Sequence, residues 1–225
     1  MNCVFCLTPV TPEVNWTYLF SKEPIAYICQ ECKAKLAFIE GNTCEVCGRT
    51  LNISQNTICI DCRKWEKDVK WQGILSKNQS LFSYNEYMKE LIGRFKYRGD
   101  YRIAAGFVLF LPKEVAKYKV VVPIPLSAER LYERGFNQVE AILDYANISF
   151  VRCLKRQHGE KQSKKTRQQR LEAENIFSLV EKDKISSQNI LLVDDIYTTG
   201  ATLRHAAKLL KEAGANSVTS LTIAR

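Results

Sequence analysis

Four cysteine pairs of the form Cys-x-x-Cys lie within the first 62 residues, and thiolates with this spacing can bind a metal ion. The pairs are Cys3/Cys6, Cys29/Cys32, Cys44/Cys47 and Cys59/Cys62. Two intervening residues let a tight turn present both sulfur atoms to one ion, and two pairs complete the tetrahedral coordination that Zn²⁺ prefers. The spacing therefore predicts two structural zinc sites, each closed by four cysteines.

Disulfide bonds are the alternative use of these cysteines. They require an oxidising compartment, which a signal peptide would indicate. The first six residues have neither a basic start nor an apolar run, and no stretch approaches the ~20 apolar residues of a membrane span. We therefore expect a cytoplasmic protein without a membrane span, in which the cysteine pairs bind metal.

Two ways of pairing the cysteines remain open. Sequential pairing joins the first two pairs at one zinc ion and the last two pairs at the other, whereas a cross-brace interleaves them. Eleven residues separate Cys47 from Cys59, which suits a short zinc ribbon and favours sequential pairing.

A second chemically informative segment follows an apolar run at residues 190–193. Asp194 and Asp195 end this run, and a short segment rich in Thr and Gly follows, with Thr198, Thr199, Gly200, Ala201 and Thr202. The pattern predicts a strand, a loop and a helix whose first N–H groups bind an anion. Two carboxylates beside that loop can accept hydrogen bonds from a sugar diol, so the segment predicts a ribose 5-phosphate site. The alternative is a Thr-rich helix cap beside two surface acids.

Two arginines follow another short apolar run, at residues 119–122. Pro123 and Ile124 end that run, and Arg130 and Arg134 come shortly after it. The guanidinium group suits a diphosphate because its donors form a fixed fork. Exposed arginines on a helix or loop, without a ligand, are the alternative.

Positive charge is concentrated further along the chain. The formal net charge of the chain is +9 at pH 7, and residues 152–170 hold eight Lys or Arg against one acid. Such a run can follow a phosphate backbone without reading its sequence. The candidate DNA-binding residues are Lys155, Arg156, Lys161, Lys164, Lys165, Arg167 and Arg170, joined by Lys96 and Arg98. The rings of three residues could stack against DNA bases, although packing in the hydrophobic core is the favoured interpretation for each. These residues are Tyr97, Tyr101 and Phe136.

The elements that must position these residues are strands alternating with helices. We expect strands at residues 119–122, 148–151, 190–193 and 217–223, and helices at residues 137–145 and 201–213, the second closed by Gly214. Alternation of this kind predicts an α/β fold with a mainly parallel sheet. A polar boundary near residues 72–80 divides the chain into a zinc-binding module, residues 1–75, and a larger domain, residues 76–225.

The loop after residue 193 resembles the 5-phosphoribosyl-1-pyrophosphate (PRPP) loop of type I phosphoribosyltransferases. The resemblance rests on the apolar strand, the Asp-Asp pair and the Thr-Thr-Gly sequence. It implies that Asp194 and Asp195 hold the ribose hydroxyls and that residues 198–202 hold the 5-phosphate. It also implies that residues 121–126 meet the pyrophosphate with Mg²⁺, and that residues 155–173 form a flexible loop over the ligand.

Nearly the whole chain is similar to the ComF family of late-competence proteins. The order of the cysteine pairs, Arg-Gly-Phe-Asn-Gln at residues 134–138, Asn-Ile-Phe at 175–177 and the Asp-Asp loop carries this likeness, as does Lys-Tyr-x-Gly at 96–99. The family implies handling of single-stranded DNA during natural transformation, with a ComFA-like helicase or translocase ATPase as partner. An active Mg²⁺-dependent phosphoribosyltransferase of nucleotide metabolism is the alternative, and PRPP binding is favoured over turnover.

The balance of charge suggests which part meets which partner. Residues 1–80 hold nine Lys or Arg against eight Asp or Glu, so metal-bound thiolates would make this part acidic. We therefore expect residues 1–75 alone to bind the ATPase and residues 80–225 to receive the DNA. Trp16, Trp65 and Trp71 either serve that partner surface or fill a small core.

Overall fold

Four parallel strands form the central sheet of the computed structural model, which describes residues 1–10, 27–51, 57–157 and 176–225. In spatial order they are β1 (Lys77–Phe82), β6 (Ser217–Ala224), β5 (Asn189–Ile196) and β2 (Val120–Pro123). All three pairings are parallel, so the carboxyl ends of the strands lie at one edge of the sheet. The predicted α/β fold with a mainly parallel sheet is confirmed.

Helices cover both faces of this sheet, as the apolar run in β5 requires. Ile190 and Leu192 pack in one hydrophobic cluster with α8 (Ala201–Glu212), whereas Leu191 and Val193 pack in another with α6 (Gln138–Tyr145). Successive side chains of a strand point to opposite faces, so a continuous apolar run needs cover on both sides. The predicted strands at β2, β5 and β6 and both predicted helices are confirmed.

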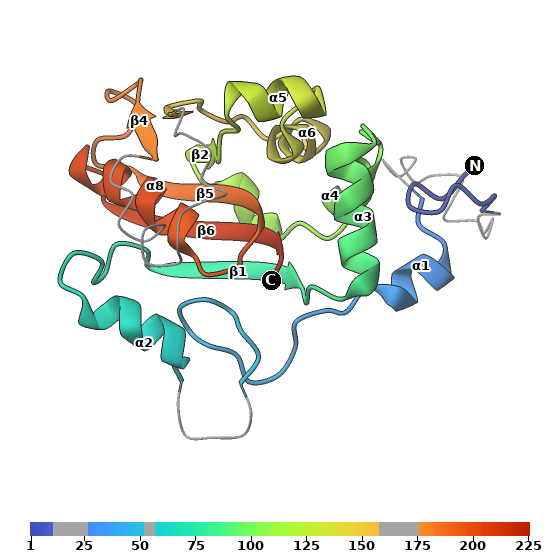
Figure 1. The fold of residues 1–225 in the computed structure, drawn as a ribbon, viewed down its shortest axis with the longest axis horizontal. Coiled ribbons are helices and arrows are strands. Elements are labelled where there is room, and N and C mark those ends of the chain that lie inside the picture. The colour runs from blue at the N-terminus through green and yellow to red at the C-terminus, as the bar shows by residue number, and fades with distance from the viewer. Residues whose placement is uncertain (11–26, 52–56, 158–175) are drawn as a thin grey trace.

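Two further helices pack at one end of the sheet (Figure 1). They are α3 (Glu86–Tyr97) and α4 (Ile103–Val108), and their buried residues share a cluster with Phe82 of β1 and Ile223 of β6. Helix α3 begins after Asn85, whose side chain accepts a hydrogen bond from the Met88 N–H at 2.8 Å. The short 3₁₀ helix η2 (Lys113–Lys117) precedes β2, and α5 (Ala128–Arg134) follows β2.

A separate antiparallel ribbon pairs β3 (Leu154–Arg156) with β4 (Phe177–Leu179). The predicted strand at residues 148–151 is wrong, because the Val151 N–H donates one hydrogen bond to the Val121 carbonyl but no ladder forms. Its apolar residues Ile148 and Phe150 pack against the cluster beneath α6 without pairing. The predicted flexible loop also begins too early, since Lys155 and Arg156 belong to β3.

The cysteine pairs pack into different parts of the molecule. Helix α1 (Gln30–Lys35) lies beside α3, whereas α2 (Ile60–Lys67) lies near β1 at the other end of the sheet (Figure 1). Cysteines near α1 share the hydrophobic cluster of α3 and α4, and cysteines near α2 share the cluster of α8. Residues 77–80, assigned above to a polar boundary, form most of β1, and a division of the chain near residue 75 stays a prediction.

Candidate functional site

The phosphate loop, which we define as residues 197–201, joins the end of β5 to the start of α8. Gly200 has a φ of +77°, which favours glycine, and a Cβ there would collide with the Tyr197 hydroxyl oxygen. The Ala201 N–H donates to Thr199 Oγ1 at 3.3 Å, while the residue at the N-cap of α8, Gly200, has no side chain that could accept a further N–H. The first turn of α8 therefore keeps N–H donors for an anion, as the sequence predicts, and Thr202 lies in that turn.

The two acids at the end of β5 meet different partners. Asp195 forms an ion pair with Lys96 of α3, with 2.7 Å between Nζ and Oδ2, and both side chains are largely buried. Asp194 Oδ1 accepts the Asp195 backbone N–H at 2.9 Å. Burial, together with the Asp195 carboxylate, raises the pKa of Asp194 to about 7, although the Asp195 N–H, Lys96 and Arg156 act in the opposite direction.

Arg156 lies near Asp194 and within electrostatic range of Arg130 and Arg134. Burial lowers the pKa of the partly buried Arg156, as do the positive charges of Arg130 and Arg134, whereas Asp194 acts to raise it. Arg134 donates to Gln138 Oε1 at 2.9 Å, and its guanidinium lies 5.7 Å from the centre of the Tyr97 ring. Guanidinium groups that repel one another are stabilised by an anion, and pyrophosphate carries the required charge.

The segment after β2 offers fewer donors than the sequence suggests. Pro123 has no N–H and pairs with Val193, and the Ile124 N–H donates to the Val193 carbonyl at 2.9 Å. The Ile124 carbonyl accepts from Asn137 Nδ2 at 3.0 Å. Both backbone groups of Ile124 are thus satisfied inside the protein, and this residue fixes the direction of the loop toward α5.

The predicted DNA-binding residues divide between two environments. Lys96 and Arg156 face the acids and arginines just described, whereas Arg98 and Lys155 are exposed. Lys161, Lys164, Lys165, Arg167 and Arg170 lie outside the described residues. Tyr97 is 77% exposed at the end of α3 and is not a core residue, while the Tyr101 ring packs 4.9 Å from that of Phe136.

The cysteines form two groups in the sequential arrangement. The first cysteine group is Cys3, Cys6, Cys29 and Cys32, and the second cysteine group is Cys44, Cys47, Cys59 and Cys62. Within each group the four sulfur atoms lie within 4.8 Å of one another, compared with about 3.8 Å for sulfur atoms bound to one tetrahedral zinc ion. The donor sets therefore fit a metal ion that prefers four thiolates.

Local structure holds the cysteines of both groups in the same way. In each group, the first cysteine pair sits on a turn closed by a residue with positive φ. This residue is Leu7 at +66° in the first cysteine group and Gly48 at +71° in the second. The second pair starts a helix, because Cys29 and Cys59 cap α1 and α2 and accept a backbone N–H through Sγ. Such N–H groups stabilise thiolates, which are the form that binds metal.

Residues beside the second cysteine group reach the phosphate loop, and the sequence analysis did not identify them as site residues. Trp65 donates to the Thr199 carbonyl, and the buried Arg204 donates to the Tyr197 hydroxyl. A cavity of about 490 Å³ borders the same loop at Thr198, and Tyr84 and Arg225 contribute to its lining. These contacts place the second cysteine group, the loop and the cavity in one region. None of the helices in the described ranges combines the length and hydropathy of a bilayer-spanning segment.

Comparison with known proteins agrees with this geometry. Residues 113–225 match the Phosphoribosyl transferase domain family. The chain is 39% identical to Competence protein ComFC of Bacillus subtilis, across 99% of this chain and 94% of that protein. It is 33% identical to Competence protein ComFC of Streptococcus pneumoniae over the full length of both chains. It is 26% identical to the DNA utilization protein YhgH of Salmonella typhi, across 85% of this chain and 93% of that protein. The chain therefore belongs to the ComFC family of competence proteins, with a phosphoribosyl transferase domain at residues 113–225.

Proposed function

We propose that this protein handles incoming single-stranded DNA in the cytoplasm during natural transformation, together with a ComFA-like helicase ATPase, and that it binds PRPP. The names of its relatives, which refer to competence and DNA utilization, support the DNA role. The observation that carries the PRPP role is the position of the phosphate loop and the acid pair at the carboxyl edge of the sheet, with the charge of Arg156 acting on Asp194.

Each part of PRPP has a matching group in this arrangement. The phosphate loop and the start of α8 supply donors for the 5-phosphate, and Asp194 and Asp195 accept from the ribose hydroxyls. Arg130, Arg134 and Arg156, whose positive charges act on one another, would bind the pyrophosphate. Mg²⁺, when bound, would neutralise part of the pyrophosphate charge. We assign zinc to both cysteine groups because their four-thiolate donor sets suit a structural zinc ion.

Calorimetric titration of the intact, metal-loaded protein with PRPP and Mg²⁺ tests the ligand. Asp194→Asn combined with Asp195→Asn removes both carboxylates without changing side-chain size, and PRPP affinity should fall at least tenfold. Asp183→Asn, an exposed acid after β4, is the matched control and should leave the affinity unchanged. Unchanged affinity in the double variant would place the ligand elsewhere.

Single-stranded DNA should bind without sequence preference and with a steep dependence on salt. Each lost phosphate contact should reduce the slope of log affinity against log salt by about 0.7. The test variant reverses the charge at Lys161, Lys164, Lys165 and Arg167, and the control reverses it at Lys33, Lys64, Lys67 and Lys113, which are exposed on other elements. Equal loss in both variants would mean that only the net charge matters.

Phosphoribosyl transfer is a second candidate function, favoured by the cavity beside Thr198. Its volume of about 490 Å³ and the presence of Tyr84 in its lining suit a planar acceptor next to the bound ribose. Turnover would release pyrophosphate from PRPP only when an acceptor is present. Pyrophosphate release measured across purine and pyrimidine bases, with the Asp194→Asn variant as control, separates turnover from binding alone.

A further inference from the structure

Trp65 connects the second cysteine group to the backbone of the phosphate loop. It lies on α2, one helical turn after Cys62, and its indole Nε1–H donates to the Thr199 carbonyl oxygen at 3.2 Å. The carbonyl of Thr199 and the N–H of Gly200 belong to one trans peptide unit and point in opposite directions. By holding the carbonyl toward α2, Trp65 directs the Gly200 N–H away from α2.

The Gly200 N–H is a donor without a protein acceptor among the described residues. A backbone donor that is left free beside the start of a helix is suited to an anion. Its direction therefore affects phosphate binding, and the indole of Trp65 fixes that direction from outside the ligand site. Trp65 is thus a candidate positioning residue.

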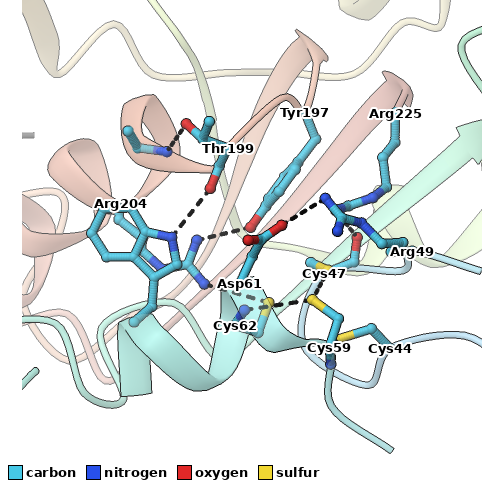
Figure 2. A network of polar contacts seen from close by, with 12 residues as sticks. Cys44, Cys47, Arg49, Cys59, Asp61, Cys62, Tyr197, Thr199, Arg204 and Arg225 are labelled. Atoms are coloured by element: carbon cyan, nitrogen blue, oxygen red, sulfur yellow. Dashed lines mark hydrogen bonds and ion pairs between the residues drawn. The ribbon is translucent and has the colours of Figure 1, made fainter. Parts of the chain in front are cut away.

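Two arginines, the buried Arg204 and the half-buried Arg225, hold the same loop through Tyr197. Arg204 donates from Nη1 to the Tyr197 hydroxyl at 2.8 Å, and its Nη2 lies 3.9 Å from Cys62 Sγ. Arg225 lies over the Tyr197 ring at 4.6 Å and donates to the Cys47 carbonyl at 2.8 Å. Figure 2 shows Tyr197 between these arginines, with Cys47 and Cys62 beside them.

The close fit around Gly200 leaves the loop little freedom to adopt another shape. A Cβ at Gly200 would collide with Arg204 Nη1 as well as with the Tyr197 hydroxyl. The Arg204 guanidinium also lies 4.8 Å from the centre of the Trp65 ring. Arg204 is fully buried, so its position depends on the sulfur, hydroxyl and indole groups that surround it.

We propose that the second cysteine group positions the phosphate loop, with Trp65 and Arg204 as the positioning residues. A metal ion held by this group would fix Cys59 and Cys62 at the start of α2, and would therefore fix Trp65 one turn later. The metal would then affect phosphate binding without touching the ligand. This inference rests on the proposed PRPP site but concerns the shape of the loop, which can be measured without ligand.

The first cysteine group has a different neighbourhood and provides the contrast. Its neighbour Phe5 packs against Phe107 of α4, with ring centres 5.6 Å apart, and the Phe5 carbonyl accepts from Arg94 of α3. No contact between this group and the phosphate loop is formed by the described residues. Only the second cysteine group should therefore be linked to phosphate binding.

Trp65→Phe tests the inference in the intact, metal-loaded chain, because it keeps an aromatic ring beside Arg204 and removes the N–H donor. Because the N–H groups of Thr198, Thr199 and Gly200 have no acceptor among the described residues, loop order is read from the heteronuclear NOE of these amides. We expect that NOE to fall without ligand in Trp65→Phe, and PRPP affinity to fall by about three- to tenfold. Trp71→Phe is the matched control: it removes an indole whose ring lies 5.2 Å from that of Trp65, and both measurements should be unchanged.

Cobalt substitution gives a spectroscopic test of the same link. Addition of PRPP should shift the cobalt–thiolate absorption of the wild-type protein, and Trp65→Phe should reduce that shift, while the first cysteine group contributes equally to both spectra. An unchanged heteronuclear NOE at the loop amides in Trp65→Phe would overturn the inference. If the wild-type protein does not bind PRPP, the proposed ligand is wrong, and the loop NOE alone then decides whether Trp65 positions the loop.

Discussion

At the scale of single residues, the neighbouring acids Asp194 and Asp195 have different tasks. Asp195 is paired with Lys96, and its remaining lone pairs can accept further donors. Asp194 depends on more distant positive charges and has a pKa near neutrality. A ligand that brings hydroxyl donors or Mg²⁺ to this pair would favour the ionised form of Asp194, so ligand binding and proton release should be coupled.

Substitution of Gly200 tests the loop at this scale. Gly200→Ala places a methyl group against Tyr197 and Arg204 and should destabilise the protein by about 1–3 kcal/mol beyond the cost of the positive φ. PRPP affinity should fall because the loop must shift. Gly41→Ala is the matched control, since Gly41 has the same φ of +77° but no atom within 4 Å of the added Cβ. Urea unfolding and calorimetry compare the two, and equal effects would contradict the crowded loop.

Asp194 should make the stability of the fold depend on pH. Its pKa is raised from 3.8 to about 7 by folding, so the protonated form stabilises the folded chain, and this contribution is lost as the pH rises through that window. Asp194→Asn does not ionise and should therefore gain stability relative to wild type between about pH 5.5 and pH 8. Urea unfolding at both pH values measures the gain, which Asp183→Asn should not show. A difference that is constant with pH would refute the prediction.

At the scale of elements, the two cysteine groups repeat one design in different surroundings. Each combines a turn closed by a positive φ with the start of a short helix. The second group is fully buried, whereas Cys6 of the first group is exposed and Cys29 is half-buried. Short helices such as α1 and α2 are not stable by themselves, so the metal and the core contacts must hold them in place.

Metal release should therefore be stepwise. We expect about two zinc ions per chain, since each cysteine group fits one ion, and binding of such an ion stabilises a small module by roughly 10–16 kcal/mol. A coloured chelator should remove the ion of the exposed first group faster than that of the second. Cys6→Ser should abolish the fast phase and leave the slow phase intact. A fast phase that persists in Cys6→Ser would assign it to the other group.

Sequence patterns predicted the elements whose signals are local. Each Cys-x-x-Cys pair, the apolar run before Asp194 and the Thr-Thr-Gly loop is a signal contained in its own short stretch of sequence. The structure contains the two cysteine groups, the strand and the loop. The pairing of Lys96 with Asp195 joins residues 99 positions apart and depends on how α3 packs beside the sheet. The positions of Arg156 and Arg204 depend on tertiary packing in the same way, so charge pattern alone assigned Arg156 to DNA and gave no role to Arg204.

At the scale of the whole molecule, the cysteine groups are not appended to the sheet but share its hydrophobic clusters. Cys44 and Cys62 belong to the cluster of Ile190 and Leu192, and Cys3 and Cys32 belong to the cluster of α3 and α4. Removal of residues 1–75 would therefore expose apolar surface on the remaining domain. The expected binding of the ATPase by residues 1–75 is better tested in the full chain, by substitutions at exposed positions.

Exposed apolar side chains near α2 provide those positions. Ile60 and Val69 are 59% and 88% exposed, and the acidic residues Asp61 and Asp68 are their neighbours in the chain. Helix α2, which Ile60 begins, lies on the side of the molecule opposite α5 in Figure 1. If this part docks the ComFA-like ATPase, Ile60→Lys with Val69→Lys should weaken a pull-down of the purified ATPase at least tenfold, because the change removes apolar contacts and reverses the local charge. Zinc content and PRPP affinity should stay unchanged, which separates docking from folding.

The control Leu131→Lys with Tyr132→Lys changes two exposed residues of α5 and should not affect the pull-down. Weaker binding only in the α5 variant would place the ATPase on the phosphoribosyl transferase domain instead.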